Sequence, residues 1–232
     1  MRLNKYISKS GLTSRRKADL LIKGASITIN GIVELNPAYH VLKNDEVRCE
    51  SKLVKRQNEA IMIMLNKPKG YITTMEDPMK RKTVMELINT KERVFPVGRL
   101  DKDSTGLLLF TNLGELAMNL SHPKNQTPKI YSVSIDKPFA NWEKKRLEKN
   151  IYIGQKEWGR AIVIEQKKDR GRTNVILKLY QGKKREIRRM MFRMKRKLFH
   201  LERIEFGPYK LGNLKIGEWR YLSKEEISYT NL

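Results

Sequence analysis

With 232 residues, the chain has room for one medium-sized domain or for a small domain followed by a medium one. Its 49 Lys and Arg against 25 Asp and Glu give a formal net charge of +24, and a chain this basic most often binds a polyanion, usually nucleic acid. A single cysteine, Cys49, excludes an internal disulfide and a zinc-binding thiolate cluster, and the absence of both a long apolar run and a signal-peptide core favours a cytoplasmic protein that does not span a membrane.

Two short helices are predicted near the N-terminus. Apolar side chains from Leu3 onward fall at helical spacing, Gly11 ends the first helix, and Thr13 or Ser14 can cap a second one. The first turn of that second helix holds three cations, Arg15, Arg16 and Lys17. Cations there oppose the helix dipole at a cost of roughly 0.3 kcal/mol or more. The cluster therefore indicates either a negatively charged partner or a solvated helix face.

A β-hairpin is predicted at residues 27–35, because isoleucines alternate with polar residues up to Asn30-Gly31, a strong signal for a two-residue hairpin turn. Residues 51–59, in contrast, have no hydrophobic period and few apolar groups, which is typical of a linker. We therefore expect a small domain at residues 1–50, a linker at 51–59 and a second domain at 60–232.

The second domain is predicted to begin with a buried strand from Ile61 to Leu65, followed by a proline-glycine turn at residues 66–70. Another strand is expected from Tyr71 to Thr74, and a short helix from Val84 to Ile88. Lys67, in the turn, has two open interpretations: a structural residue beside the sheet, or a contact to nucleic acid.

The densest polar stretch is VGRLDKDSTGLLLFTN, residues 97–112. A strand from Val94 to Val97 enters it, and the continuous apolar run from Gly106 to Phe110 predicts a strand covered on both faces. Asp101 therefore lies where a sheet passes into a loop, so the scaffold can fix its backbone while its side chain reaches a pocket. The alternative is a surface turn whose aspartates cap backbone amides.

A helix is predicted from Leu113 to Leu120 and ends at His122-Pro123, where the histidine is typical of a cap and not of a general base. The segment from Lys129 to Ile135 alternates as a strand does, with Tyr131 on the face it shares with Val133. Further predicted elements are an exposed helix at residues 139–150, strands at 161–164 and 175–179, and a solvated lysine-rich loop at 166–172.

The segment QGKKREIRRMMFRMKRK, residues 181–197, predicts an amphipathic helix with a basic outer side. Between residues 183 and 197, nine basic residues accompany one acid, Glu186, a net charge of +8. Its apolar face is expected to be core: Ile187, Met190, Met191, Met194 and Leu198. A helix lying on anionic lipid would need a broader apolar face.

Residues 97–112 resemble the catalytic motif of the ribosomal RNA pseudouridine synthases that modify single uridines. The family pattern is glycine-arginine-leucine-aspartate, then a hydroxyl residue, a glycine, an aliphatic run and threonine-asparagine. The matching residues are Gly98, Arg99, Leu100, Asp101, Ser104, Gly106, Leu107, Leu108, Leu109, Thr111 and Asn112. Further motifs match at residues 67–70, 129–135, 182–188 and 206–220, so the resemblance spans nearly the whole chain.

The resemblance implies an α+β fold. A small helical and hairpin RNA-binding domain of the alpha-L type, which residues 2–48 resemble, would precede a catalytic domain with a mixed, mainly antiparallel sheet. It also implies that Asp101 is the essential carboxylate, that Tyr131 stacks on the target base, and that Arg188 pairs with Asp101. A guanidinium next to a carboxylate favours the ionised form, so this pairing is physically reasonable.

RNA contacts are expected at the basic clusters, made through phosphates and therefore with little sequence choice. The residues concerned are Arg15, Arg16, Lys17, Lys67, Arg99, Lys183, Lys184, Arg185 and Arg189. One position departs from the family pattern: Lys195 stands where many relatives have a glycine. Either the helix runs longer there or the turn differs.

From these motifs we predict an isomerase that converts one uridine of ribosomal RNA to pseudouridine, with the large subunit favoured over the small one. The uridine would be extruded into the pocket, because it cannot react inside an RNA helix. No metal or cofactor is expected, since the chain has neither a phosphate-binding glycine loop nor a histidine-glutamate zinc motif. We expect a monomer that acts on ribosomal RNA, either free or within an immature ribosomal subunit.

The alternative function is that of a non-catalytic RNA-binding ribosome assembly factor with the same fold. The basic clusters fit both functions, but a binder without activity would be free to lose Asp101, Tyr131 or Arg188, and all three are present. A DNA-binding helix-turn-helix protein is a third option. Its recognition helix would need polar side chains for base edges, whereas residues 14–24 offer mainly cations.

Overall fold

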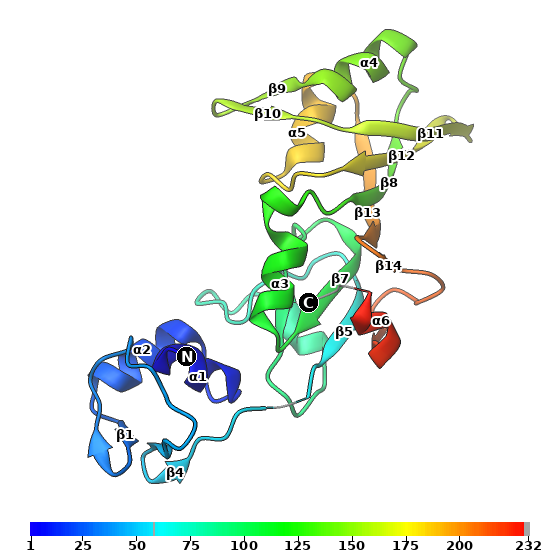
Figure 1. The fold of residues 1–232 in the computed structure, drawn as a ribbon. Helices are drawn as coiled ribbons and strands as arrows, with labels where there is room; N and C mark the ends of the chain where they lie inside the picture. Colours follow the sequence, from blue (N-terminus) through cyan, green and yellow to red (C-terminus); the bar gives the residue numbers. More distant parts are fainter. Residues whose placement is uncertain (58, 230–232) are drawn as a thin grey trace. The chain divides into compact units, whose positions relative to one another are not determined.

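The structure is a computed structural model, and it describes residues 1–57 and 59–229 (Figure 1). The chain divides into two compact units. The first comprises Met1–Ile61 with Thr90–Val94, and the second comprises Met62–Asn89 with Phe95–Leu232. Among the described residues, no helix combines the length and the apolar character needed to cross a membrane.

The first unit packs two helices against a small antiparallel sheet around one hydrophobic core. The helices are α1, Leu3–Lys9, and α2, Arg15–Lys23. In the described part of this unit the sheet has the order β2-β1-β3-β4, with β1 Ile27–Ile29, β2 Ile32–Val33, β3 Val47–Cys49 and β4 Lys52–Leu53. The Ser14 hydroxyl accepts a 3.2 Å hydrogen bond from the Lys17 backbone N–H, so Ser14 is the residue that caps α2. Asn30 and Gly31 have φ values of 53° and 84°, as the predicted two-residue hairpin turn requires.

The segment expected to be a linker, residues 51–59, is partly structured. Its second and third residues form β4, which pairs with β3. Val54, only 6% exposed, belongs to the core of the first unit, and its carbonyl accepts a 3.2 Å hydrogen bond from the Tyr6 hydroxyl. Position 58 lies outside the described residues. A two-residue edge strand is too short to show a hydrophobic period, which explains why the sequence did not reveal it.

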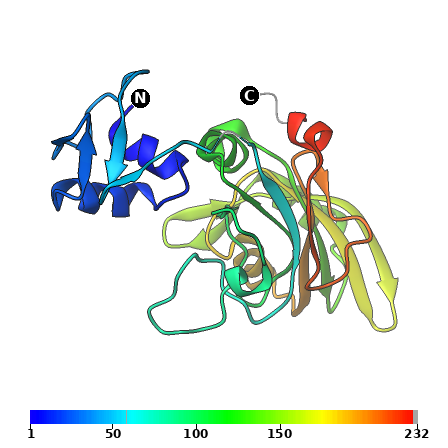
Figure 2. The same cartoon turned by 90° about the horizontal axis from the view of Figure 1, so that it is seen from below.

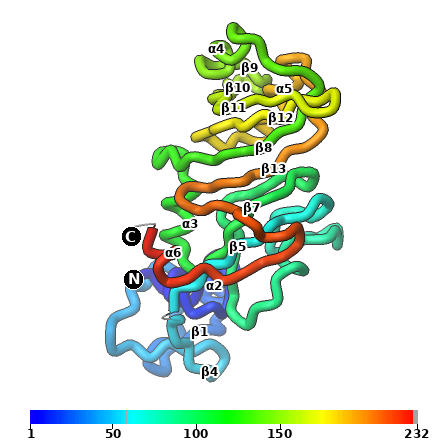
Figure 3. The backbone as a smooth tube through the Cα atoms, turned by 90° about the vertical axis from the view of Figure 1, so that its right-hand side faces the viewer, coloured from blue at the N-terminus to red at the C-terminus, as the bar shows by residue number. Residues whose placement is uncertain are grey.

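The second unit is built on one large sheet. Over the described residues it has nine strands, with a main path β11-β12-β8-β13-β7-β5-β15, while β14 pairs with β13 and β6 pairs with β7. The strands are β5 Met62–Lys67, β6 Phe95–Val97, β7 Thr105–Thr111, β8 Lys129–Ile135, β11 Ile162–Asp169, β12 Arg172–Leu179, β13 Leu198–Phe206, β14 Tyr209–Lys210 and β15 Trp219–Tyr221. Among these described strands only β13 and β7 are parallel neighbours, so the predicted mixed, mainly antiparallel sheet is confirmed. Figure 3 can be followed strand by strand from β11 to β5.

Helices cover this sheet in two groups, each with its own hydrophobic cluster. The helices are η1 Val84–Leu87, α3 Gly114–Ser121, η2 Pro123–Asn125, α4 Asn141–Lys149, α5 Glu186–Arg193 and α6 Lys224–Ser228. One cluster joins α4 and α5 to β8, β12 and the small hairpin of β9, Ile151–Gly154, and β10, Glu157–Gly159. The other joins α3 to β5 and β7. Met190 and Met191 are at most 1% exposed, so the methionine face of α5 is core, as predicted.

Two local predictions for the second unit are wrong. The segment from Tyr71 to Thr74 forms no strand; a single bridge joins Ile72 to Thr83, and the chain loops away from the sheet (Figure 2). Residues 166–172 are not a loop, because they form the paired ends of β11 and β12. The turn between those ends is Arg170-Gly171, with φ values of 44° and 78°. Side chains there are mostly exposed, so no apolar alternation marked the strands.

The C-terminus of α5 resolves the departure at Lys195. The helix ends at Arg193, earlier than residues 181–197 suggested. The Lys195 N–H then donates to the Phe192 carbonyl at 3.1 Å, and the Arg196 N–H donates to the Met191 carbonyl at 2.9 Å. These are the two hydrogen bonds of a Schellman motif, in which a glycine is usual because φ is positive. Lys195 adopts a φ of 51°, so the lysine makes the left-handed turn itself and the helix does not run longer.

Candidate active site

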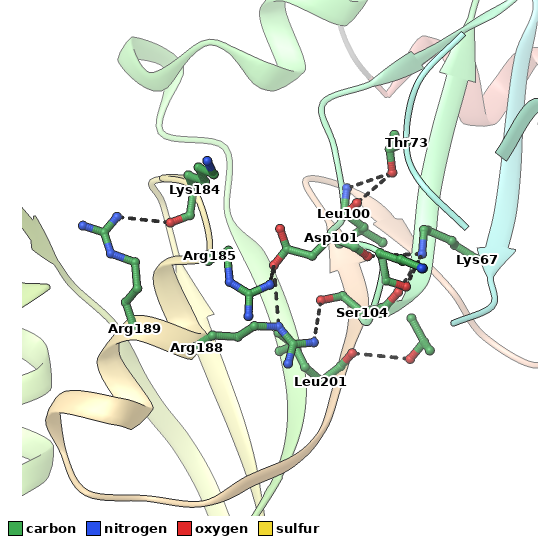
Figure 4. Close-up of polar contacts among 12 residues, drawn as sticks. Lys67, Thr73, Leu100, Asp101, Ser104, Lys184, Arg185, Arg188, Arg189 and Leu201 are labelled. Carbon is green, nitrogen blue, oxygen red and sulfur yellow. Dashed lines mark hydrogen bonds and ion pairs between the residues drawn. The ribbon is translucent and has the colours of Figure 1, made fainter. Parts of the chain in front are cut away.

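A buried lysine fixes the loop that carries Asp101. Lys67, at the end of β5, is 0% exposed, and its ammonium donates to the backbone carbonyls of Pro68 (3.0 Å), Asp101 (3.2 Å), Lys102 (3.4 Å) and Ser104 (2.9 Å). Figure 4 shows its nitrogen directed at this loop. Burial lowers the pKa of Lys67 to about 8, against the opposing effect of the Asp101 and Asp103 charges. The expected RNA contact by Lys67 is therefore wrong: its side chain is inside the protein and holds the loop.

Further backbone contacts complete this support. The Thr73 hydroxyl donates to the Leu100 carbonyl at 2.8 Å and accepts from the Leu100 N–H at 3.2 Å. The loop also closes on itself, because the Ser104 N–H donates to the Asp101 carbonyl at 3.0 Å. The backbone of Asp101 is consequently fixed on both sides, while its carboxylate stays 30% exposed. This is the arrangement expected when a rigid scaffold presents a reactive group.

Gly106 lets β7 approach β13 closely enough to complete the site. Its φ is 98°, and a Cβ added there would lie 2.3 Å from the Arg203 carbonyl oxygen. Real Cβ atoms do not approach a backbone oxygen so closely, so any larger residue would push the two parallel strands apart. The family-like glycine after Asp101 therefore has a steric reason in this fold.

Two arginines from the start of α5 face the carboxylate. Arg188 Nε lies 3.6 Å from Asp101 Oδ2, and Arg185 Nη1 lies 4.0 Å from the same oxygen. Arg188 also donates from Nη2 to the Ser104 hydroxyl at 3.2 Å, so one guanidinium spans both groups (Figure 4). The 3.6 Å separation is an ion pair and is too long for a hydrogen bond. Asp101 is thus next to positive charge without being locked by a short contact.

Tyr131 lines the same cleft as Asp101. The cleft has a volume of about 640 Å³, within the range of roughly 300–1,000 Å³ found for ligand pockets. Asp101, Tyr131 and Arg188 all line it, although they come from the loop before β7, from β8 and from α5. Tyr131 is half-buried and packs against the core cluster that contains Ile187. The structure therefore brings the three predicted catalytic residues to one cavity.

The predicted RNA-contacting residues divide into three groups. Those that line the cleft are Arg99, Lys183, Lys184 and Arg185. Those that are exposed at the first turn of α2, in the first unit, are Arg15, Arg16 and Lys17. The third group consists of Lys67 and Arg189, whose side chains serve the fold.

Arg189 is the second residue whose predicted RNA contact is not what the structure shows. It donates from Nε to the Ile153 carbonyl at 2.8 Å and from Nη2 to the Gly154 carbonyl at 2.6 Å, and it pairs with Glu157. Its guanidinium is thus engaged by the β9–β10 hairpin, which the sequence had not predicted. Arg189 ties α5 to that hairpin, so its guanidinium serves the fold and the predicted RNA contact is wrong.

Sequence reasoning placed Ser104 in the motif without giving it a contact, and it missed two other supporting residues of the site, Thr73 and Arg203. Ser104, Thr73 and Arg203 each bond an element distant in sequence, and Arg203, 2% exposed, donates from Nε to the Leu107 carbonyl at 2.8 Å. The one available signal was a charged residue among the apolar positions of β13. The Nδ1 atom of His122 accepts a 3.2 Å hydrogen bond from the Lys124 N–H at the start of η2, which confirms the capping interpretation. Among the described residues, no three His, Cys, Asp or Glu side chains gather as metal ligands.

Comparison with known families gives two matches. Residues 61–192 match the model for RNA pseudouridylate synthase, and residues 1–47 match the S4 domain model. Ribosomal large subunit pseudouridine synthase B of Bacillus subtilis (strain 168) is 32% identical over 229 residues, which cover 97% of this chain and 93% of the relative. Dual-specificity RNA pseudouridine synthase RluF of Escherichia coli (strain K12) is 33% identical over 231 residues, covering 98% of this chain and 77% of the relative. A solved structure described as a crystal structure of pseudouridylate synthase is 26% identical and has a TM-score of 0.69 over 99% of both chains.

Proposed function

The chain belongs to the RNA pseudouridylate synthase family and begins with an S4 domain, and we propose that it isomerises one uridine of ribosomal RNA to pseudouridine with Asp101 as its catalytic carboxylate. One observation carries this proposal: Asp101, held by a fixed loop, shares a cleft with Tyr131 and lies 3.6 Å from Arg188. The negative charge of the carboxylate lies next to the positive charges of Arg188 and Arg185, which face the same oxygen.

The reaction rearranges one nucleotide without net addition of atoms. Asp101 acts on the ribose either by attack at the anomeric carbon or by removal of a neighbouring proton. The bond from the uracil N1 to the anomeric carbon breaks, the uracil turns within the cleft, and its C5 forms the new bond to that carbon. The proton of C5 is released and N1 takes up a proton. Tyr131 stacks on the base throughout, which keeps the free uracil in the cleft.

The target uridine must leave the RNA helix to reach Asp101, since a cleft lined by side chains cannot admit a duplex. Arg99, Lys183, Lys184 and Arg185 at the cleft supply the charge that holds the displaced backbone. The exposed cations Arg15, Arg16 and Lys17 of the S4 domain bind phosphates elsewhere on the same RNA.

Ribosomal RNA is proposed as the substrate because a full-length relative, 32% identical, is named a ribosomal large subunit pseudouridine synthase. We place the target in the large subunit for the same reason. Another relative of similar identity is named a dual-specificity RNA pseudouridine synthase, so the substrate test should include a second RNA class. The large-subunit RNA is offered both free and within immature subunits.

The decisive experiment is release of tritium from 5-tritiated uridine, because the new bond forms at C5. Large-subunit rRNA transcripts are the expected substrate, and transcripts of a second RNA class are tested beside them. The native chain should release one tritium per target site. Asp101→Asn keeps the size of the side chain but removes its charge. It should lower the rate of tritium release by at least about 10²-fold. RNA binding measured by filter retention should remain within about twofold, as expected for a change that affects the chemical step alone.

The matched control is Asp103→Asn, an exposed aspartate in the same loop that lines no part of the cleft. It should retain native activity. If the native chain releases no tritium from naked RNA or from immature subunits, the enzyme proposal fails and a non-catalytic RNA-binding assembly factor remains. If Asp101→Asn retains activity, Asp101 is not the catalytic carboxylate.

A further inference from the structure

A second cavity adjoins the cleft and shares Tyr131 with it. It has a volume of about 470 Å³ and is formed by β8, β12, β13 and the segment 180–183. Tyr131, Gly182 and Lys183 line both cavities, so the second one is continuous with the proposed active site. Asp101 and Arg188 line the cleft but not this second cavity.

The charged residues that line the second cavity are all positive. Its lining includes six cations, and none of the described residues that line it is Asp or Glu. The cations are Arg99, Lys129, Arg160, Lys178, Lys183 and Arg203. They come from separate strands and loops, so the fold gathers positive charge here at an electrostatic cost. A gathering of this kind, with no carboxylate to balance it in the wall, fits an anionic ligand.

The deepest two cations retain donors that the protein does not use. Arg203 is 2% exposed, and its Nη2 has no hydrogen-bond partner among the described residues. Lys129 is 9% exposed and donates to the Thr127 carbonyl at 3.0 Å, with its ammonium 5.2 Å from the centre of the Phe206 ring. An ammonium has three donors, so this single carbonyl leaves capacity for a ligand. Buried donors without partners are uncommon and call for an explanation.

The electrostatics of Lys129 agree with an anion site. Burial, helped by the neighbouring Arg203 charge, lowers the pKa of Lys129 to about 8. The acid that acts on it, Glu186, is itself buried and lines the adjoining cleft. Burial raises the pKa of Glu186, and the backbone N–H groups of Lys183 and Arg160 donate to its carboxylate. The charge of Glu186 thus offsets only part of the cost of burying the Lys129 ammonium. An anion in the cavity would offset the remainder.

We propose that this cavity, the cationic pocket, binds the backbone phosphate of the nucleotide next to the target uridine. The inference rests on the proposed function, because RNA is the anion that the adjoining cleft would bring. Tyr131 lines both spaces, so a target base in contact with its ring would have the neighbouring phosphate within reach of the cationic pocket. Gln181, whose Oε1 is buried without a hydrogen-bond partner among the described residues, offers an acceptor for the hydroxyl of that nucleotide.

The pocket would anchor the strand at the point where the target base leaves it. A phosphate fixed beside Tyr131 holds the strand equally before and during the reaction, so this contact strengthens substrate binding without changing the chemical step. Arg160 and Lys178 lie at the accessible edge of the pocket, whereas Lys129 and Arg203 form its floor.

The test uses the full chain and a small probe, uridine 3′,5′-bisphosphate, with uridine as the uncharged reference. The pocket variant is Arg160→Gln with Lys178→Gln, since these residues are accessible and their replacement leaves the buried floor intact. The matched control is Lys167→Gln with Lys168→Gln, two exposed cations on β11 that line neither cavity. All binding is measured by titration calorimetry at low salt.

The native chain should bind the bisphosphate at least tenfold more tightly than uridine. The pocket variant should lose about tenfold in affinity for the bisphosphate and keep its affinity for uridine, whereas the control should change by less than twofold. In the tritium assay the KM of the pocket variant should rise by about tenfold with kcat within twofold. The pocket variant should also lose one phosphate contact to RNA. The slope of the logarithm of its RNA-binding constant against the logarithm of salt concentration should therefore become shallower by roughly 0.7.

Equal affinity of the native chain for bisphosphate and uridine, or an unchanged bisphosphate affinity in the pocket variant, would overturn the proposal. The same loss in the control would also overturn it, because the effect would then reflect net charge alone. The bisphosphate titration does not depend on isomerisation. A native chain that binds the bisphosphate as described but releases no tritium would leave the pocket supported and refute the proposed function.

Discussion

Lys67 and Lys129 occupy comparable places in two neighbouring regions of the second unit. Each lies at an end of a sheet strand, and burial lowers the pKa of each to about 8. Lys67 directs its ammonium at four backbone carbonyls and fixes the loop of Asp101. Lys129 bonds a single carbonyl and lies in the wall of the cationic pocket. One region is complete in the free protein, and the other retains unused donors.

The difference shows how the same residue type serves structure in one place and binding in another. A buried ammonium with all its donors bonded contributes to a rigid loop, because any movement of that loop leaves a charge without partners. A buried ammonium with spare donors is held less completely, and a ligand can improve its surroundings. The partners that surround a buried cation therefore distinguish the two roles, and its burial or its pKa alone does not.

The largest effect is expected from replacing Lys67, the lysine that holds the Asp101 loop. Lys67→Met leaves the carbonyls of the Asp101 loop without their shared donor, so we expect the free energy of unfolding to fall by about 3 kcal/mol and tritium release to fall sharply. Lys129→Met should cost about 1 kcal/mol, since only one carbonyl loses its donor. Urea unfolding measures both. An equal loss of stability in the two variants would contradict the distinction drawn between them.

The next effect tests whether charge alone suffices beside Asp101. Arg188→Lys keeps the positive charge but cannot reach both Asp101 and the Ser104 hydroxyl with one planar group. We expect kcat for tritium release to fall by roughly 10–100-fold, with RNA binding unchanged. Arg185→Lys, at 4.0 Å from the same carboxylate oxygen and more exposed, is the matched control and should lose far less. A native kcat in Arg188→Lys would show that the reaction does not need one planar group to contact both Asp101 and Ser104.

The role proposed for Lys129 predicts that the affinity for phosphate depends on pH. Lys129 is protonated below its pKa of about 8 and neutral above it, so its attraction for phosphate is present at pH 7 and is lost as the pH rises through 8. Between pH 7 and 9 the affinity for uridine 3′,5′-bisphosphate should fall by up to about tenfold. Arg203 and Glu186 are the charged groups that also act on Lys129.

Lys129→Met should bind the bisphosphate more weakly and nearly independently of pH over that range. A native affinity that rises between pH 7 and 9 would refute the assignment of Lys129. Lys67 has the same pKa of about 8, but it lines neither cavity, so it gives the ligand no comparable dependence.

The smallest effect lies outside both regions, at the end of α5. Lys195 holds a φ of 51°, which costs a lysine about 1 kcal/mol relative to glycine. Lys195→Gly should therefore raise the free energy of unfolding by up to about 1 kcal/mol, with tritium release and bisphosphate affinity unchanged. Thermal unfolding measures the gain. Lys156→Gly, another lysine with positive φ, at 58°, provides the comparison in a hairpin.

Several elements could be predicted from sequence because their signal is local. The apolar runs of β5 and β7, the alternation of β8 and the Asn30-Gly31 turn all appear as expected. The family resemblance that rests on these motifs is confirmed by the match of residues 61–192. Most of the elements that were missed are short or exposed, namely β4, β9, β10 and the outer halves of β11 and β12. Such strands are stabilised by pairing with neighbours and carry little hydrophobic period of their own. The central strand β13 was also missed, because its first residue, Leu198, continues the helical spacing of the preceding apolar face.

The errors at the site have a different origin. Lys67 and Arg189 lie in basic, family-like motifs, so the sequence suggested contacts to RNA. Lys67 bonds carbonyls of the Asp101 loop, which lie at least 34 residues away in sequence. Arg189 bonds carbonyls of the β9–β10 hairpin, which lie at least 35 residues away. A carbonyl is present at every residue, and therefore no sequence pattern indicates which one a lysine or arginine will reach.

The sequence by itself determined the chemistry that is available: the excess of positive charge, the motif around Asp101, and the residues Tyr131 and Arg188 that accompany it. Side-chain type and local spacing are sufficient for these. Only the tertiary structure decided which cations are buried and bonded, and which of them gather around a cavity without acids. That outcome depends on how β8, β12 and β13 lie beside one another, because the interaction between charges is set by distance in space and not by separation along the chain.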